Sequence, residues 1–327
     1  MGIKGLNTII KNKFSKCISY INIQELNNTK IAIDANLWLY STLATARKNY
    51  IKNLNLSIED INEEEITKKW LIISFNFLSQ LLFYKIVPIL IFDGKHDEQK
   101  SGTQSKRIDQ RNKIKDKIEE LREIFNKNKD DILLRDDSLL KKALSNYVFL
   151  TKDNLTIFKE IATNIGYCCI TAEAEGEKLC SDLCIEKKVD YVFSKDSDML
   201  ALTCPLIITE FNFNSIKVIN INVLIEEMGF NKETFQDFCI LLGCDWNHNI
   251  KKCGPVQSLK LINKYKNINN IPLDKECLNY EFCKKQFTFK NTDIDEEKLI
   301  FDYNKFSEYR KYLISNNHLY LINCFCF

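Results

Sequence analysis

The sequence lacks any run of about 18 uncharged apolar residues, so it predicts no membrane-spanning helix. Its N-terminus lacks the basic-then-apolar order of a secretory signal, which argues against secretion. Its thirteen cysteines include no C-x-x-C pair and form no regular framework, so we expect reduced, buried thiols in an intracellular, reducing compartment. The same absence disfavours a zinc site, for which the nearest candidates are Cys239, Cys244, His248 and Cys253.

The chain also lacks a dominant charge. Its 46 basic and 44 acidic residues give a net charge of +2, so the whole chain does not indicate a polyanionic partner. No internal repeat is evident. A length of 327 residues and a hydrophobic content of 45% suit one large domain or two intimate ones with a sizeable core.

Short apolar runs that end near carboxylates recur along the chain. We predict buried strands at the four such runs, which are Lys30–Asp34, Val87–Asp93, Cys168–Ala172 and Tyr191–Ser194. Helical patterns lie between them, at Thr67–Tyr84 and Glu175–Lys187. This alternation predicts an α/β domain with a largely parallel sheet.

The acids at these strand ends form a candidate site, because parallel sheets bind ligands at the carboxyl ends of their strands. Each acid alone has an ordinary interpretation, since Asp is common in loops and Glu in the first turn of a helix complements the helix dipole. Acids at four separate strand or helix ends are harder to explain in that way. They are Asp34, Asp93, Glu175, Glu177, Asp196 and Asp198.

The chain becomes helical from Asn231 onward. The run Lys232–Leu242 predicts an amphipathic helix capped by Gly243, and a second helix, Val256–Lys264, follows the turn Lys251–Pro255. Lysines at that turn suggest a hairpin that grips DNA phosphates, although a plain helical hairpin fits equally well. The apolar end, 319–327, fits either a packed strand or an exposed partner segment.

A basic segment lies between Lys100 and Lys117, where seven Lys or Arg residues stand against two Asp. Arg107, Arg111 and Lys115 have helical spacing and would share one face, which could follow phosphates. A solvated helix face is the alternative, but such faces usually mix the two signs more evenly.

Several of these stretches together resemble the flap endonuclease/XPG family of structure-specific nucleases. They are MGIKGL, IAIDAN, IFDGKHDEQKSGTQSKR, AEAEGE, SKDSDML and CILLGCDW followed by IKKCGP, in order from residue 1 to about 265. The resemblance implies a PIN-like α/β nuclease domain, a helical cap over the site and a C-terminal helix-two-turn-helix region that binds DNA. We accordingly divide the chain into a nuclease region (1–122, with the cap starting near 95), a variable cap segment (123–150), an internal nuclease region (151–230) and a helical DNA-binding region with a C-terminal extension (231–327).

The resemblance also implies roles for individual residues. The metal-binding acids would be Asp34, Asp93, Glu175, Glu177, Asp196, Asp198 and Asp245, while Glu173 does not match the family spacing. Lys100 and Arg107 would contact the scissile phosphate and complete the catalytic set. Tyr40 and Arg47 resemble an aromatic stacker and an arginine beside the DNA. Further DNA contacts would come from Arg111, Gly243, Lys251, Lys252 and Gly254. Lys252 departs from the family pattern, because it stands where the family usually has the glycine that lets backbone approach phosphate closely.

The implied activity is that of a flap endonuclease-like 5′ nuclease, with 5′–3′ exonuclease activity as well. It would hydrolyse DNA by two-metal catalysis near junctions of single and double strands, in replication or repair. Oxygen ligands suit two Mg²⁺ ions, and Mn²⁺ should substitute. A processive 5′–3′ exonuclease and a four-way junction resolvase share the same carboxylates, and a silent scaffold would be expected to have lost some of them. An aspartate-dependent phosphatase is a further alternative. We expect a monomer acting on branched or flapped DNA, without a recognisable sliding-clamp peptide.

Overall fold

The computed structural model describes residues 2–56, 60–94, 108–127, 137–247, 249–251 and 253–325, and the backbone of 101–107. The chain divides into two compact units. The first comprises Met1–Ala35, Tyr84–Lys100 and Cys168–Phe301, and the second comprises Asn36–Phe83, Ser101–Tyr167 and Asp302–Phe327. No helix in the described part of the chain has both the length and the apolar content needed to span a bilayer.

The first unit is built on one sheet with the strand order β1-β7-β6-β5-β2-β3-β4. Its strands are β1 (Ile18–Ile21), β2 (Lys30–Asp34), β3 (Val87–Phe92), β4 (Cys168–Thr171), β5 (Tyr191–Phe193), β6 (Leu206–Asn212) and β7 (Ser215–Asn220). The five neighbouring strands β6, β5, β2, β3 and β4 are all parallel. At the other edge of the sheet, β7 pairs antiparallel with β6, and β1 pairs antiparallel with β7. The predicted, largely parallel sheet is confirmed, and all four predicted strands belong to it.

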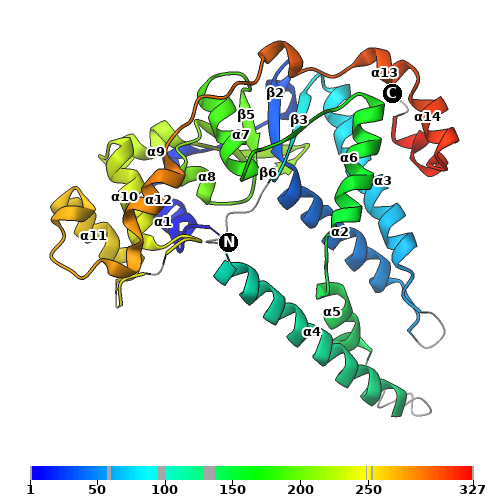
Figure 1. Cartoon of the computed structure of the whole chain (residues 1–327), viewed down its shortest axis with the longest axis horizontal. Helices are drawn as coiled ribbons and strands as arrows, with labels where there is room; N and C mark the ends of the chain where they lie inside the picture. Colours follow the sequence, from blue (N-terminus) through cyan, green and yellow to red (C-terminus); the bar gives the residue numbers. More distant parts are fainter. Residues whose placement is uncertain are drawn as a thin grey trace. The chain divides into compact units, whose positions relative to one another are not determined.

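Helices of the first unit precede the sheet, follow its strands or form the C-terminal helical part. Helix α7 packs on β2, β3 and β5, and α10 packs against α11 and α12 (Figure 1). The helices are α1 (Leu6–Lys13), α7 (Gly176–Ile185), α8 (Asp198–Ala201), α9 (Ile221–Glu227), α10 (Lys232–Leu242), α11 (Pro255–Tyr265) and α12 (Tyr280–Phe287). The 3-10 helices are η1 (Ser15–Cys17), η2 (Ile23–Leu26), η4 (Ile268–Asn270), η5 (Glu276–Leu278) and η6 (Glu296–Lys298).

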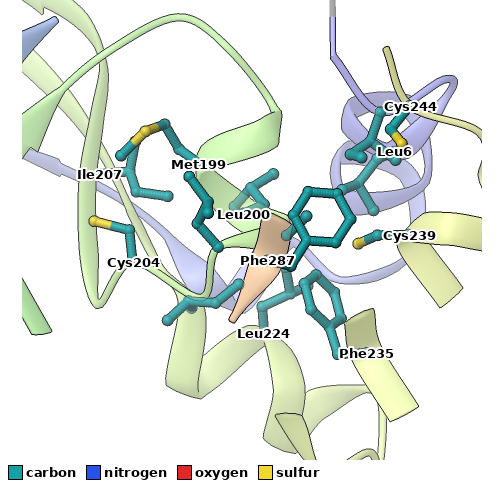
Figure 2. Packing of buried hydrophobic residues seen from close by; sticks show 14 of the residues in the cluster. Leu6, Met199, Leu200, Cys204, Ile207, Leu224, Phe235, Cys239, Cys244 and Phe287 are labelled. Atoms are coloured by element: carbon teal, nitrogen blue, oxygen red, sulfur yellow. The ribbon is translucent and has the colours of Figure 1, made fainter. Parts of the chain in front are cut away.

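The core of this unit joins sheet and C-terminal helices in one apolar cluster. Phe287 of α12 lies among Leu200, Cys239 and Phe235, and Leu6 of α1 lies beside Cys244 (Figure 2). Burial of these side chains removes apolar surface from water and holds α10 against both α8 and α12. The N-terminal segment and the C-terminal helical part therefore share a core with the sheet.

The second unit is helical. Its elements are α2 (Ala35–Lys52), α3 (Glu63–Phe83), α4 (Ser101–Lys127), α5 (Ser138–Asn146), α6 (Lys152–Ile165), α13 (Tyr303–Ser307), α14 (Tyr309–Ser315) and η7 (Leu319–Phe325). Helix α3 begins four residues before the predicted Thr67, because Asn62 accepts a hydrogen bond from the Glu65 amide at 3.1 Å and caps the helix. The predicted helical spacing of the basic segment is borne out by α4.

Aromatic side chains form the core of the second unit. Phe75 and Phe158 stack with ring centroids 5.0 Å apart, and the rings of Trp38 and Trp70 each lie 5.9 Å from that of Phe158. The C-terminal residues join this core, because the ring of Phe325 lies 5.9 Å from that of Phe75. The end of the described chain is therefore packed, as a 3-10 helix in place of a strand.

Candidate metal centre and nucleic-acid interface

The central parallel strands bring three of the candidate acid positions to the same edge of the sheet. Asp34 is the last residue of β2 and pairs in register with Ile91 of β3, two residues before Asp93. Ile33 of β2 pairs with Phe193, the last residue of β5, and the loop carrying Asp196 follows. Because these strands are parallel, their carboxyl ends and the acids after them lie side by side.

Hydrogen bonds connect the acids after β2 and β5. The buried Ser194 hydroxyl donates to Asp34 Oδ2 at 3.2 Å and accepts from the Asp196 amide at 3.1 Å. The Asp198 amide in turn donates to Asp196 Oδ1 at 3.2 Å. Ser194 thus positions acids from two strands. The sequence analysis assigned no role to Ser194. Its position directly after a buried strand, within SKDSDML, was the feature that could have indicated this role.

Asp93 and the acids of α7 are positioned together. Asp93 Oδ1 accepts a hydrogen bond of 2.8 Å from the Gly176 amide at the start of α7, where the helix dipole favours negative charge. The Gly94 amide donates to the Ala174 carbonyl at 2.7 Å, and a Cβ on Gly94 would lie 1.9 Å from the Ala172 carbonyl oxygen. Glycine at this position therefore allows the β3 loop to approach the segment before α7.

Three of the predicted ligands meet in a single group. Glu177, Asp196 and Asp198 each offer a carboxylate oxygen, and these three oxygens lie within 4.8 Å of one another. Glu177 and Asp198 are buried, and Asp196 is half-buried. At such separations two carboxylates repel by about 3 kcal/mol at an effective dielectric near 20. A set of oxygen donors held this close fits a hard divalent cation, which would offset the repulsion.

Two buried thiols lie within electrostatic range of the same acids. Burial raises the pKa of Cys180 well above its ordinary value, and the charges of Asp34, Asp93 and Glu177 raise it further. Burial likewise raises the pKa of Cys239, with Asp198 adding to the effect. The charges of acids from β2, from the segment after β3 and from α7 thus all act on this one buried thiol.

Within the described part of the chain, the other four predicted acids are not members of this group. Asp34 is buried, and Asp93, Glu175 and Asp245 are half-buried, with Glu175 at the N-cap of α7. Among the described residues, the group of ligand atoms within 4.8 Å comprises Glu177, Asp196 and Asp198 alone. The roles of the other four stay predictions.

Glu173, which sequence reasoning left out of the ligand set, faces elsewhere. Its side chain is 90% exposed and forms an ion pair of 3.0 Å with Lys290. This contact raises the pKa of Lys290, through the hydrogen bond first and the charge second. An exposed ion pair of this kind contributes little to stability.

The N-terminal segment contacts the acid group directly, a feature that sequence reasoning missed. Gly2 has φ +94°, and a Cβ placed on it would lie 2.2 Å from Asp196 Oδ1 and 2.4 Å from Ser197 Oγ. The Lys4 amide donates to the Gly243 carbonyl at 3.0 Å, and Lys4 Nζ donates to Asn249 Oδ1 at 2.8 Å. Residues 2–4 therefore link the acid group to the turn after α10.

We expect Gly2→Ala to weaken divalent-ion binding about tenfold. Either the new methyl group displaces the Asp196 carboxylate, or the backbone at residue 2 shifts away from it, and an alanine at this positive φ is strained in addition. Calorimetric titration with Mn²⁺ measures the effect. Gly254→Ala is the matched control, since a Cβ there meets nothing within 4 Å. Equal Mn²⁺ affinity in Gly2→Ala and wild type would contradict the close approach.

The candidate DNA-contacting residues have diverse surroundings. Tyr40 is 44% exposed on α2, whereas Arg47 is buried, with an ion pair to Glu63. The Arg111 guanidinium carbon lies 3.6 Å from the ring centroid of Phe149, a cation–π contact. Gly243 and Gly254 flank the α10–α11 turn, together with the exposed Lys251.

Some predicted residues fall outside the described part of the chain. They are Lys100, Lys252 and His248, together with the side chain of Arg107. Their assignments stay predictions.

Comparison with curated proteins finds several flap endonucleases. The chain is 29% identical to Flap endonuclease 1 of Cryptosporidium parvum over 334 residues, covering 94% of this chain and 64% of that protein. It is 28% identical to Flap endonuclease 1 of Entamoeba histolytica, covering 97% of this chain and 84% of that protein. It is 30% identical to Flap endonuclease 1 of Lodderomyces elongisporus, covering 83% and 68%. The chain thus spans 64% to 84% of the length of these relatives.

Solved structures share the fold. Flap endonuclease-1 from Methanococcus jannaschii superposes with a TM-score of 0.63 at 20% identity, covering 94% of this chain and 96% of that chain. The catalytic core of Rad2 in complex with DNA substrate superposes with a TM-score of 0.62 at 16% identity, covering 99% and 100%. At these identities the likeness establishes the architecture.

A largely parallel sheet flanked by helices, with carboxylates at its carboxyl edge that fit a divalent cation, is the architecture of the PIN-like nuclease class. Residues 1–114 match the XPG N-terminal domain, and residues 166–245 match the XPG I-region, which contains Glu177, Asp196 and Asp198. Together with the relatives above, these matches show that the chain belongs to the flap endonuclease/XPG family of structure-specific nucleases.

Proposed function

We propose that this protein is a Mg²⁺-dependent 5′ nuclease that hydrolyses DNA phosphodiester bonds where single and double strands meet. The convergence of Glu177, Asp196 and Asp198, within the part of the chain that matches the XPG I-region, carries the proposal. Oxygen ligands without histidine or cysteine favour Mg²⁺, with Mn²⁺ as a substitute.

The acid group is preorganised for this chemistry. Glu177, Asp196 and Asp198 would hold the metal, with Asp34, Asp93, Glu175 and Asp245 contributing directly or through water. When bound, two ions would lower the pKa of water and neutralise charge on the phosphate. Ser194 holds Asp34 and Asp196 in place, and the α7 amide of Gly176 holds Asp93, so the ligands need little rearrangement.

The phosphate would meet positive charge from the basic segment. Lys100 and Arg107 are the residues that we expect at the scissile phosphate, because two ions supply four positive charges against seven carboxylates. The planar fork of Arg107 can grip phosphate oxygens, whereas Lys100 acts as a compact charge. The relatives named above include a Rad2 catalytic core in complex with DNA substrate, which supports DNA as the ligand.

The duplex would be held at the α10–α11 turn. Helix α11 starts at Pro255 with Gly254 as its N-cap and no side-chain cap, so the amides of its first turn are available to a phosphate. Lys251 is exposed beside it. Gly243, Lys252 and Arg111 are further proposed contacts, and Tyr40 is sufficiently exposed to stack on a base.

The experiment is cleavage of labelled DNA by purified protein with Mg²⁺. We expect a 5′-flap duplex to be cut near its junction, with chelation abolishing the reaction. A nicked duplex and a four-way junction in the same assay separate flap cleavage from processive exonuclease or resolvase activity. A silent scaffold would bind the flap duplex without cutting it, and a phosphatase would release phosphate from a small monoester. Either of these results would overturn the proposal.

We further propose that the protein acts as a monomer in a reducing, intracellular compartment, in DNA replication or repair. The cysteines in the described part of the chain are free thiols and are mostly buried, which supports a reducing environment.

A further inference from the structure

Arg47 is a buried arginine that ties together three helices. It is 6% exposed, and it lies in α2 within the helical unit. Its Nη1 donates to both carboxylate oxygens of Glu63 in α3, each at 2.8 Å. Its Nε donates to the Leu144 carbonyl in the last turn of α5 at 2.8 Å. The Tyr147 ring lies 5.9 Å from the guanidinium carbon.

This arrangement suits a clamp better than a DNA contact. The Arg47 side chain is buried although Glu63 is largely exposed, so Arg47 would give up its ion pair and its hydrogen bond to Leu144 if it turned toward a phosphate. A cation at the last turn of α5 also complements the negative end of that helix. The geometry is therefore complete without nucleic acid.

The clamp is connected to the basic face of α4. Helices α4 and α5 pack against each other (Figure 1). Ile118 and Phe125 are buried on α4, and Leu144 is buried on α5. Five residues after Leu144, the Phe149 ring supports the guanidinium of Arg111 at 3.6 Å. Arg47 thus fixes the segment from Leu144 to Phe149, and Arg111 of the basic face packs on Phe149.

We infer that Arg47 is a positioning residue that clamps α5, and through the segment up to Phe149 orients the basic face of α4, without touching DNA itself. The inference rests on the proposed function only for its effect on cleavage. The clamp itself is a property of the protein without DNA.

The test compares four variants, which are Arg47→Met, Arg47→Lys, Glu63→Gln and Lys48→Met. Lys48→Met is the matched control, because it removes one positive charge from an exposed neighbouring position on α2. Glu63→Gln provides the decisive comparison, since Glu63 has a largely exposed side chain and its replacement does not threaten the fold. If Arg47 acts as a clamp, loss of its ion pair with Glu63 should loosen α5. If Arg47 binds DNA, the same loss should free its side chain to reach a phosphate.

Amide hydrogen exchange of residues 138–149 is measured first, without DNA. We expect Arg47→Met and Glu63→Gln each to accelerate exchange there by about tenfold. Arg47→Met removes the hydrogen bond to the Leu144 carbonyl at the end of α5, and Glu63→Gln removes the charge that holds the guanidinium in place to make that bond. Arg47→Lys should restore part of the protection, since lysine lacks the planar fork. Lys48→Met should match wild type. Wild-type exchange in Glu63→Gln would overturn the clamp.

Cleavage of a 5′-flap duplex is measured second. We expect Arg47→Met and Glu63→Gln to lower kcat by about tenfold with a smaller change in KM, and to leave the salt dependence of DNA binding unchanged. A rise in KM with a salt slope reduced by about one is the behaviour of a phosphate contact and would overturn the inference. If wild type cleaves no branched DNA, the proposed function fails, and the exchange experiment still decides the clamp.

Discussion

Replacement of Asp196 by asparagine is expected to reduce cleavage of a 5′-flap duplex by about 10³-fold, equivalent to roughly 4 kcal/mol of transition-state stabilisation. Asp196 is the half-buried member of the group that it forms with Glu177 and Asp198. Asparagine keeps the size of the side chain and an oxygen that can accept from the Asp198 amide, so the loop should hold its shape. What is lost is one negative charge and one metal ligand. Single-turnover kinetics measure the rate.

Although Asp196→Asn should slow cleavage, it should make the metal-free protein more stable. Removing one of three carboxylates within 4.8 Å relieves repulsion, which we estimate at about 1 kcal/mol after solvent screening at this half-exposed position. Thermal unfolding in chelator should therefore show a higher Tm for Asp196→Asn, and added Mn²⁺ should raise the Tm of wild type more than that of the variant. Glu173→Gln is the control, because Glu173 is exposed and paired with Lys290. A variant that cuts as fast as wild type would remove Asp196 from the chemistry.

The strands and the edge that they share were predictable because their signals are local. Runs such as Lys30–Asp34 and Tyr191–Ser194 are short, apolar and followed by acids, and parallel sheets place such ends together. The position of Asp34, Glu177, Asp196 and Asp198 near a common point follows from that topology. The hairpin of β6 and β7, which extends the sheet with antiparallel strands, has a weaker pattern and was not predicted.

The partners of the side chains were not predictable, because they are distant in sequence. Ser194 contacts Asp34 across 160 positions, and Arg47 contacts Leu144 across 97. No spacing rule within one helix or strand connects such pairs. Arg47 illustrates the consequence, since the family resemblance implied an arginine beside the DNA, and nothing in the sequence indicated its contacts with Glu63 and the end of α5.

Asp237 is the clearest example of a residue with a large expected effect that no motif indicated. It lies in α10 with 1% exposure. Its Oδ1 accepts from the Tyr280 hydroxyl and Lys284 Nζ, each at 3.0 Å, and its Oδ2 accepts from the Ile268 amide at 3.1 Å. One carboxylate thus joins α10 to the start of η4 and to two residues of α12. The sequence alone indicates only that Asp237 is one of the polar residues of an amphipathic helix.

We expect Asp237→Ala to lower the free energy of unfolding by about 3–5 kcal/mol, because it removes the carboxylate that accepts from the Ile268 amide and the Tyr280 hydroxyl and that pairs with Lys284. Denaturant unfolding measures the loss. Asp274→Ala is the control, since Asp274 is an exposed acid that caps only the amide of Glu276, and its replacement should cost about 1 kcal/mol or less. Asp237→Asn should fall between the two, because the amide oxygen can still accept one of these hydrogen bonds.

The tyrosine beside Asp237 provides an independent readout of the same network. Burial raises the pKa of Tyr280 above its ordinary value, and the charge and hydrogen bond of Asp237 raise it further. A tyrosine whose folded pKa is raised contributes stability that is present below its unfolded pKa of about 10 and is lost as the pH rises beyond it. Asp237→Ala should therefore lower the pKa of Tyr280 in an ultraviolet titration and flatten the loss of stability above pH 10. An unchanged pKa together with a small loss of stability would show that α10 and α12 are held by the apolar core around Phe287 instead.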